Sequence, residues 1–517
     1  MNVRDEPHTL GRWLPERAAV AGERIAIDDR GVTITYSALD QRAAALAARL
    51  TAAGYGPGDR VVTVSGNSID HVVAFFACAR TGLVFVPLSW RLTAGELAAL
   101  LERTAPALIL VDDEYSALAR DAVLRSGVAA PAAQLGTVGV EACVPQRCGT
   151  ATPTRPVRDD DPLLVIYTSG SEAAPKGVVL THANCFWTNL SLAGALQLTA
   201  EDTVLSVLPQ FHVAGWNVQP LLAWWVGATV VLERTFSPGR VLQLIAERRV
   251  TAMMGVPTQY RMLAEDPAFA ASRLDSLHAP LVGGATIGAE LSRVWAARGI
   301  PLIQGYGLTE AGPNVLHLPA AEAAAHPDAV GRPYPHVETA VVDPASGLPL
   351  EGEATGELWV RGPGVFAGYL DDPDATARTM SAGWLRTGDL VQRDGAGVHR
   401  IVDRLKEIFI TGGENVAPAE VERVLAAHPA VAEVAVVGAP DPVWGERGVA
   451  FVVRADAAPL SADELLAHAR QHLAVFKLPS RVVFVDDLPR TTIHKVARST
   501  LRARARAITE EDAHERR

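Results

Sequence analysis

Ten residues at positions 168–177, TSGSEAAPKG, have the composition of a phosphate-binding turn. Hydroxyl groups, backbone N–H groups beside glycine and a lysine ammonium all donate hydrogen bonds to phosphate oxygens. The pattern is not the G-x-x-x-x-G-K-[ST] loop that begins a helix, because strand-like sequence lies on both sides. A turn of this composition is by itself more often only a turn, so other nucleotide-binding residues must accompany it. The candidate phosphate-binding residues are Thr168, Ser169, Gly170, Ser171 and Lys176.

Four other stretches carry side chains that suit a nucleotide. PLIQGYGLTEAG (301–312) combines glycines with an aromatic ring, a hydroxyl and a carboxylate. WLRTGDLVQRDG (384–395) places a carboxylate after a Thr-Gly turn, and IVDRLKEIFITGGENVAP (401–418) has basic residues before a second glycine turn. LPRTTIHKVAR (488–498) holds a lysine near the end of the chain. The residues of interest in these stretches are Tyr306, Gly307, Thr309, Glu310, Asp389, Arg404, Lys406, Glu414 and Lys495.

The elements that position these residues alternate between helix and strand. Apolar residues at helical spacing fill 36–54 and 68–82, and short β-branched runs fill 59–66 and 83–89. Such alternation predicts parallel sheets with helices packed on their faces. We expect the Pro- and Arg-rich loop at 145–161 to separate two such lobes.

The expected secondary structure changes twice in the second half of the chain. Short strands between Gly and Pro turns at about 330–400 predict a small β-barrel or sheet. After Arg404 the alternation returns, and about 110 residues suffice for a small α+β domain. The residues after about 507 look like a disordered end.

Composition excludes several classes of protein. A chain of 517 residues is too long for one hydrophobic core. The formal net charge of −11 argues against nucleic acid as the main partner. The four cysteines lack zinc-site spacing, and neither a signal peptide nor a membrane-spanning apolar run is evident. We therefore expect a soluble cytoplasmic protein, and a homodimer is the general expectation for such enzymes.

Together these motifs resemble the adenylate-forming superfamily, which includes acyl-CoA synthetases, peptide-synthetase adenylation domains and luciferase-like enzymes. The resemblance extends from TYSALDQRAAALAARL near the start to PRTTIHK near the end. It implies an α/β fold with two doubly wound lobes and a small β-barrel at 1–403, a hinge at 404–406, and a small mobile α+β domain at 407–517. It also implies two half-reactions, in which ATP first converts a carboxylic acid to an acyl-adenylate and a thiol then takes the acyl group.

The resemblance assigns roles in nucleotide binding. Tyr306 would stack on adenine, and Thr309 would bind the α-phosphate. Glu310 would hold Mg²⁺, a hard cation that prefers oxygen ligands. Asp389 would accept the ribose hydroxyls with support from Arg404, although an ordinary ion pair is the alternative. Gly283, Gly284, Ala285 and Gly307 would line the same nucleotide site.

Further roles concern the acyl group, the hinge and CoA. His212 in LPQFHVAGW matches the aromatic gate of the acyl pocket, with Trp216 as a candidate wall, although both residue types are often plain core. Small residues, among them Gly283 and Gly307, would leave room for a large hydrophobic acid. Lys406 matches the hinge residue. The residues that match the approach of the thiol are Gly412, Gly413 and Glu414.

The phosphate-binding turn departs from the family at two positions. Family members usually have a second threonine and a glycine where this chain has Glu172 and Ala173. A carboxylate about 4 Å from one phosphate of ATP would cost about 4 kcal/mol at an effective dielectric constant of about 20. That cost corresponds to roughly a thousandfold in affinity or rate. Mg²⁺, or rotation of Glu172 into solvent, would remove much of it.

The lysine motif departs as well, because His494 stands before Lys495 where the family usually has glycine. In the family this lysine offsets charge that develops during adenylation. Both departures affect the first half-reaction. The pattern therefore predicts an enzyme that forms acyl-CoA from an acyl-adenylate and CoA, with its own adenylation step weakened or lost. A separate adenylating enzyme would then supply the acyl-AMP.

A complete ATP-dependent carboxylic acid–CoA ligase for a large hydrophobic acid is the alternative, since Lys176, Glu310, Asp389 and Lys495 are all present. Weaker alternatives are a carrier-protein-directed adenylation enzyme, a luciferase-like oxidase and a non-catalytic paralogue. Random loss of function would not confine the departures to one step, which argues against the paralogue. The sequence leaves the identity of the acid open.

Overall fold

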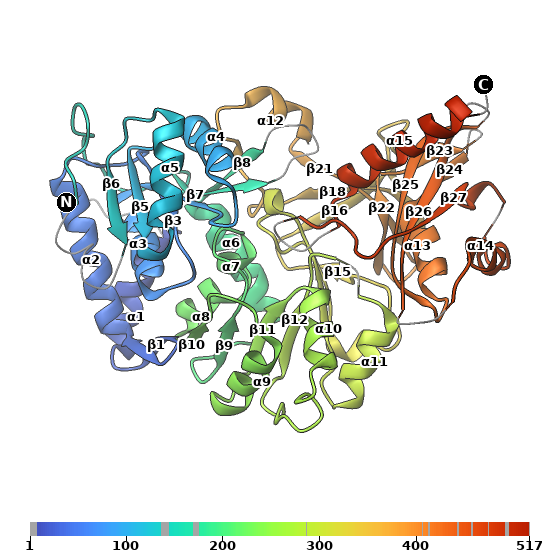
Figure 1. Ribbon diagram of the computed structural model, residues 1–517. Helices are drawn as coiled ribbons and strands as arrows, with labels where there is room; N and C mark the ends of the chain where they lie inside the picture. Colours follow the sequence, from blue (N-terminus) through green and yellow to red (C-terminus); the bar gives the residue numbers. More distant parts are fainter. Residues whose placement is uncertain are drawn as a thin grey trace. The chain divides into compact units, whose positions relative to one another are not determined.

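Strands and helices alternate along most of the chain, as shown for a computed structural model in Figure 1. By compactness the chain divides into a first unit of residues 1–339 and 359–386 and a second unit of residues 340–358 and 387–517. The expected domain boundary with its hinge at 404–406 stays a prediction. The structure describes residues 8–135, 144–168, 175–285, 287–405, 407–411, 414–441, 444–455, 459–473, 475–491 and 496–515.

A seven-stranded mixed sheet forms one part of the first unit. Strands β7, β4, β3, β5 and β6 run parallel, and β8 and β19 are antiparallel additions at one edge. Every residue of β4 is buried, as is typical of a parallel strand covered on both faces. In spatial order the strands are β19 (Gly368–Tyr369), β8 (Lys176–Thr181), β7 (Pro162–Thr168), β4 (Val84–Leu88), β3 (Arg60–Val64), β5 (Leu108–Asp112) and β6 (Ala132–Leu135).

Two helices, α2 (Tyr36–Ala52) and α3 (Ile69–Thr81), form where the apolar spacing predicts them. Helix α3 begins at a Ser68 cap, whose hydroxyl accepts from the His71 N–H, and ends at Gly82 with φ +69°. Glycine adopts this left-handed conformation without the steric penalty of a Cβ. Further helices of this part are α4 (Ala94–Thr104) and α5 (Ser116–Ser126), which pack on the sheet, and α6 (His182–Ala195).

A nine-stranded mixed sheet forms the other part of the first unit. Its centre is parallel from β13 to β1, and β14, β15 and β2 are antiparallel at the two edges. In spatial order the strands are β15 (Arg332–Pro333), β14 (Leu316–Leu318), β13 (Ile303–Tyr306), β12 (Ala279–Val282), β11 (Ala252–Gly255), β9 (Thr203–Ser206), β10 (Thr229–Leu232), β1 (Ile25–Asp29) and β2 (Val32–Thr35).

Helices of this second lobe pack around an apolar cluster that includes Tyr260 and Trp295. Strands β9 to β12 lie side by side with α9, α10 and α11 next to them in the green part of Figure 1. The helices that contribute to this cluster are α9 (Pro238–Glu247), α10 (Pro257–Glu265) and α11 (Ala289–Ala297), and further helices are α1 (Trp13–Ala21), α7 (Ala214–Asn217) and α8 (Pro220–Val226).

The loop at 145–161 does not separate the two lobes, contrary to the expectation from its composition. Strand β7 follows this loop and pairs with β4, which precedes it, so both belong to one sheet. The chain passes to the nine-stranded sheet only after α6, at β9. Strand pairing is set by contacts distant in the sequence, and a Pro-rich loop does not record them.

The expected barrel is a half-barrel, because its six strands follow an open path. The short strands expected at about 330–400 are present, among them β16, β18 and β22. The strands are β17 (Pro349–Leu350), β16 (Glu338–Val342), β18 (Ala354–Arg361), β21 (Trp384–Arg393), β20 (Met380–Ser381) and β22 (His399–Arg404), which pairs with β21. Helix α12 (Pro373–Thr379) precedes β20.

The C-terminal part contains a five-stranded sheet covered on both faces. Val436 and Val452 face a cluster with α13 and α14, whereas Val437 and Phe451 face Leu501 of α15. Helix α15 continues through the residues after about 507 for which the sequence predicts disorder, and its Ala and Arg residues favour helix. The elements are β23 (Phe409–Thr411), β24 (Glu414–Val416), β25 (Val431–Asp441), β26 (Gly445–Arg454), β27 (Arg481–Phe484), α13 (Pro418–Ala426), α14 (Ala462–Arg470) and α15 (Arg498–Glu515).

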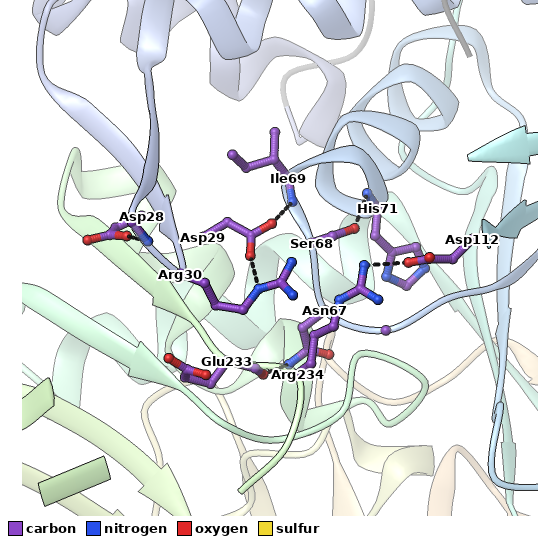
Figure 2. A network of polar contacts seen from close by, with 12 residues as sticks. Asp28, Asp29, Arg30, Asn67, Ser68, Ile69, His71, Asp112, Glu233 and Arg234 are labelled. Atoms are coloured by element: carbon purple, nitrogen blue, oxygen red, sulfur yellow. Dashed lines mark hydrogen bonds and ion pairs between the residues drawn. The ribbon is translucent and has the colours of Figure 1, made fainter. Parts of the chain in front are cut away.

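Polar contacts join the two sheets of the first unit where their parallel strands end, and Figure 2 shows them. Asp29, at the end of β1, accepts a hydrogen bond of 3.1 Å from the N–H of Ile69, the first residue of α3. Arg234, which follows β10, forms a 2.6 Å ion pair with Asp112 at the end of β5. Within the described residues, no helix is both long and apolar enough to cross a membrane.

A buried histidine ties the start of the chain to α6. His182 Nδ1 accepts a 3.1 Å hydrogen bond from the N–H of Leu10, and the imidazole has no exposed surface. Burial lowers the pKa of His182 to about 4, because the charged ring would lose its hydration. The folded protein therefore keeps this ring neutral at a pH where the unfolded chain protonates it.

Stability should consequently fall as the pH drops from about 6.5 towards 4, and His182→Asn should reduce this fall. Asn places an acceptor oxygen where Nδ1 lies but does not titrate. Above the unfolded pKa, neutral His182 contributes its full share to the free energy of unfolding, about 3 kcal/mol at roughly 1.4 kcal/mol per unit of pKa difference. This share is lost as the pH falls towards the folded pKa. Urea unfolding of both proteins between pH 7.5 and 4.5, followed by tryptophan fluorescence, measures it. Parallel pH profiles would contradict the assignment.

Candidate active site

The predicted adenine-binding residues lie together at the carboxyl edge of the nine-stranded sheet. Strands β12 and β13 are parallel neighbours, with Val282 paired to Gln304. Gly283 therefore follows one strand where Tyr306 ends the other. Ligands of α/β proteins bind beyond this edge, because the loops that leave parallel strands converge there. The structure thus brings Gly283, Gly284, Ala285, Tyr306 and Gly307 to one place.

Three of these glycines are required by their surroundings. A Cβ on Gly283 would lie 2.8 Å from the carbonyl oxygen of Gly305, and one on Gly307 would lie 1.4 Å from that of Pro313. Gly284 has φ +82°, in the region that side chains rarely adopt. The glycine-rich sequence at both turns therefore reflects close approach of backbone segments.

A single tyrosine contacts both the lysine and the carboxylate that the sequence assigns to phosphate and metal. The Tyr369 hydroxyl donates a 2.9 Å hydrogen bond to Glu310 Oε1. The Lys176 ammonium lies 5.2 Å from the centroid of the same ring, a cation–π distance. Strand β19 carries Tyr369 and pairs with β8, where Lys176 begins the strand. Three segments distant in the sequence thus meet at one ring.

Much of the phosphate-binding turn lies outside the described residues, namely Ser169, Gly170, Ser171, Glu172 and Ala173. Its two ends are described. Thr168 and Lys176 are directly paired across the antiparallel strands β7 and β8. The turn is therefore the connection of a hairpin, which agrees with the strand-like sequence on both sides of it.

Glu310 can serve as a metal ligand of the kind that Mg²⁺–nucleotide complexes use. It lies in the short turn η3 (Thr309–Ala311) together with Thr309, and both are partly exposed. Among the described residues, no group of three or more His, Cys, Asp or Glu could hold a metal ion. Because Mg²⁺ is commonly held by one or two carboxylates and by substrate phosphates, a single carboxylate that shares a tyrosine contact with the predicted phosphate-binding lysine fits that ion.

The loop that carries His212 is held by Asn67. The Asn67 amide donates to the carbonyls of Leu208, at 2.9 Å, and Glu233, at 3.1 Å, and its oxygen accepts from the Gln210 N–H at 2.9 Å. All three hydrogen bonds of this buried side chain link the segment after β3 to the loops after β9 and β10. His212 lies two residues after Gln210, and its N–H donates to the Pro209 carbonyl.

Trp216 packs in the core of the first unit. Its ring stacks on Phe75 with centroids 4.5 Å apart, and Phe85 contacts it edge-on. The indole N–H donates a 2.6 Å hydrogen bond to the Gln210 carbonyl. No surface of this side chain is exposed. Its expected place in the acyl pocket stays a prediction.

The predicted ribose-binding pair belongs to the second unit. Asp389 and Arg404 are directly opposite each other on β21 and β22, and Arg404 Nε lies 2.7 Å from Asp389 Oδ1. The carboxylate is 2% exposed, whereas the arginine is about half exposed. Arg404 thus orients a buried carboxylate, whereas both groups of an ordinary surface ion pair are exposed to solvent.

Several predicted residues lie outside the described residues: Lys406, Gly412, Gly413, His494 and Lys495. The backbone of Glu414 begins β24. Next to the predicted hinge, Asp403 accepts hydrogen bonds from the N–H groups of Arg404 and Ala419. Burial raises the pKa of Asp403 to about 6. This carboxylate connects strand β22 to the start of α13.

Sequence reasoning missed Tyr369 and Asn67. Tyr369 lies in FAGYLDD, a stretch without hydroxyl or basic clusters, and Asn67 follows a strand in VSGNS. A Gly-Asn-Ser sequence after an apolar strand is a signal for a turn at the carboxyl edge, and it could have marked Asn67 as a candidate. Nothing local marks Tyr369, because both of its partners are distant in the sequence.

Comparison with known proteins agrees with this fold. Residues 14–370 match the AMP-binding enzyme family, and residues 420–495 match the AMP-binding enzyme C-terminal domain. The chain belongs to this adenylate-forming family, as its motifs predict.

Similar proteins of named activity show which kind of enzyme within this family the chain resembles. A feruloyl-CoA synthase from Amycolatopsis sp is 39% identical over 96% of this chain and 99% of its own. An indoleacetate–CoA ligase from Aromatoleum aromaticum is 36% identical over 95% of this chain and 97% of its own. The crystal structure of ATP-bound MatB from Rhodopseudomonas palustris aligns with a TM-score of 0.88 at 32% identity, covering 97% of this chain and 99% of that one. The protein is an enzyme of the acid–CoA ligase, or acyl-CoA synthetase, type.

Removing the hydroxyl of Tyr369 tests its contact with Glu310. Tyr369→Phe keeps the ring beside Lys176 but leaves the carboxylate without this donor. We expect a threefold to tenfold lower rate of acid-dependent ATP–pyrophosphate exchange, from about 0.5–1.5 kcal/mol for one hydrogen bond. The loss should be greatest at limiting Mg²⁺.

A second tyrosine of the same unit provides the matched control. The buried Tyr55 hydroxyl donates a 3.1 Å hydrogen bond to the Pro145 carbonyl, in the loop that precedes β7. Tyr55→Phe therefore also removes one hydroxyl and one hydrogen bond, and it should leave the exchange rate unchanged. An equal effect of the two substitutions, or none of Tyr369→Phe at limiting Mg²⁺, would contradict the assignment.

Proposed function

We propose that the protein is a complete ATP-dependent carboxylic acid–CoA ligase. It would convert an acid, ATP and CoA to acyl-CoA, AMP and pyrophosphate. The contact of Tyr369 with both Glu310 and Lys176 carries this proposal. An enzyme that received ready-made acyl-adenylate would not need a metal-binding carboxylate held beside a phosphate-binding lysine.

Glu172 and His494 favour an enzyme that carries out thioesterification alone. That hypothesis is less well supported than its alternative, the complete ligase. Relatives that match nearly the whole chain are named as CoA synthase and CoA ligase, and a structural neighbour binds ATP. Within the described residues nothing indicates a lost adenylation step. A carboxylate in the phosphate-binding turn is compatible with ATP if it turns towards solvent or towards the metal side of the phosphates.

In the first half-reaction, an oxygen of the substrate carboxylate attacks the α-phosphorus of ATP, and pyrophosphate leaves. Lys176 and Thr309 would hold phosphate oxygens, and Glu310 would hold Mg²⁺, which supplies charge neutralisation when bound. In the second, the CoA sulfur attacks the acyl carbon and AMP leaves. The thiol proton is released to solvent.

The acid is expected to be compact and aromatic. The feruloyl and indoleacetyl groups in the relatives' names are both aromatic acyl groups.

A paired assay tests the complete reaction. CoA is supplied either with free acid, ATP and Mg²⁺ or with synthetic acyl-AMP, and thioester and pyrophosphate are measured. We expect thioester by both routes, with rates within about tenfold. Thioester from acyl-AMP alone, with no pyrophosphate from acid and ATP, would contradict the proposal. Lys495→Ala is the matched control, because it should reduce the ATP route at least a hundredfold and spare the acyl-AMP route.

The double variant Glu172→Thr, Ala173→Gly tests whether the unusual turn hinders ATP. A complete ligase already keeps the carboxylate away from the phosphates. We therefore expect kcat/KM for ATP to change by less than about tenfold, well below the roughly thousandfold that full electrostatic repulsion implies. A hundredfold gain, seen in initial rates at subsaturating ATP, would show that the natural turn restricts adenylation.

A further inference from the structure

A small cavity in the nine-stranded lobe is lined by residues of β9, of β11 and of the segment from α7 to α8. It measures about 10 Å³, enough for a single water-sized group. Most of its lining residues are apolar, and two of them, Ser206 and Gln219, are polar. The lining residues are Val204, Leu205, Ser206, Val207, Leu208, Ala214, Val218, Gln219, Pro220 and Met254.

Both polar side chains have a buried atom without a hydrogen-bond partner among the described residues: Ser206 Oγ and Gln219 Oε1. Ser206 is 5% exposed and Gln219 is fully buried. The orientation of the Gln219 amide is fixed, because its nitrogen donates to the Ala279 carbonyl at 3.2 Å. The unpartnered Gln219 atom is therefore an acceptor, and the Ser206 hydroxyl can donate or accept.

Leaving two such atoms unpaired is costly, and the backbone adds to the cost. Buried polar groups are almost always hydrogen-bonded, so each exception needs an explanation. Gln219 also has φ +77° and ψ −51°, a conformation that non-glycine residues rarely adopt. Strained residues that persist are concentrated at ligand-binding sites. The Gln219 amide is thus held, at a cost, where it can meet a ligand.

Met254 places this cavity next to the glycine turn of the nucleotide site. It is the direct partner of Ser206 across β9 and β11, so the two side chains are neighbours on one face of the sheet. Its methyl group also lies 3.1 Å from where a Cβ on Gly283 would be. One side chain therefore separates the cavity from the turn where the acyl-adenylate is expected. Ala214, which lines the cavity, follows His212, the predicted gate of the acyl pocket, by two residues, so the cavity lies on the side where the acyl group is expected.

We propose that this cavity binds a hydroxyl or N–H group at the end of the acid remote from its carboxylate. The group would donate to Gln219 Oε1 and, as a hydroxyl, accept from Ser206 Oγ. The acid's ring would extend past Met254 towards Gly283. Acids with an apolar end are disfavoured, because they would bury both polar atoms unpaired. This inference rests on the proposed function in taking a carboxylic acid as the substrate.

The volume limits the length of the acid. One water-sized space accepts a hydroxyl or an N–H but not further methylene groups. Unless Ser206 or Gln219 moves, a long alkyl chain has nowhere to continue. The cavity therefore suits the polar end of a compact acid better than a long alkyl chain.

Pairs of acids that differ by one hydroxyl test the proposal. The probes are phenylacetic, 3-phenylpropanoic and 4-phenylbutanoic acids and their ring-hydroxylated (para) forms. We expect a preference of at least tenfold in kcat/KM for the hydroxylated member of at least one pair. Ser206→Ala should reduce that preference at least fivefold. Val204→Ala, on the same strand and lining the same cavity without a polar atom, should change both members of the pair alike.

Calorimetric binding of the same acids, with AMP present and no turnover, separates this inference from the proposed function. Conversion of all acids without any hydroxyl preference would overturn the inference and leave the ligase intact. A hydroxyl preference in binding that Ser206→Ala reduces, without thioester formation from any acid, would support the cavity assignment and refute the ligase. If Ser206→Ala does not fold, Gln219→Met removes the acceptor at similar length. Unchanged preference in the folded variants would overturn the proposal.

Discussion

The arrangement of the first unit depends on hydrogen bonds that one side chain, Asn67, makes between its two sheets. Its amide satisfies two carbonyls and one N–H in loops that leave β9 and β10, although Asn67 itself follows β3. These groups are buried, so losing the amide would leave several of them unpaired at about 1–3 kcal/mol each. Asn67 thereby holds Leu208, which lines the cavity, and Gln210, which lies in the loop with His212. Figure 2 shows Asn67 and Glu233 at this joint.

The nucleotide-binding residues of the first unit are positioned by a second constraint, the close approach of backbone segments at the carboxyl edge of the nine-stranded sheet. Gly283 and Gly307 have no space for a Cβ, and a bulkier residue would separate β12 and β13 or displace Pro313. The glycines thus bring two turns within reach of one ligand. The tyrosine that ends β13 is left partly exposed beside them, where its ring can meet a flat base.

Motif spacing predicted the family, the α/β lobes and the pairing of Asp389 with Arg404, because each depends on residues close in sequence or on a complete motif. It misplaced the boundary between the lobes, since the pairing of β7 with β4 joins segments separated by a long loop. Motif spacing also did not identify Tyr369 or the pair Ser206 and Gln219. The importance of Tyr369 lies in partners distant along the chain, and that of the pair lies in polar atoms left unpartnered among the described residues. Neither is visible in local composition.

The position of Tyr369 has a consequence for how such sequences vary. Its ring contacts Lys176 and its hydroxyl contacts Glu310, so positions 176, 310 and 369 share one environment although almost two hundred residues separate the first from the last. A substitution at one of them alters the surroundings of the other two. Among relatives that handle ATP in the same way, these three positions should therefore change together or not at all, and an unmatched change would mark a chain whose chemistry has diverged.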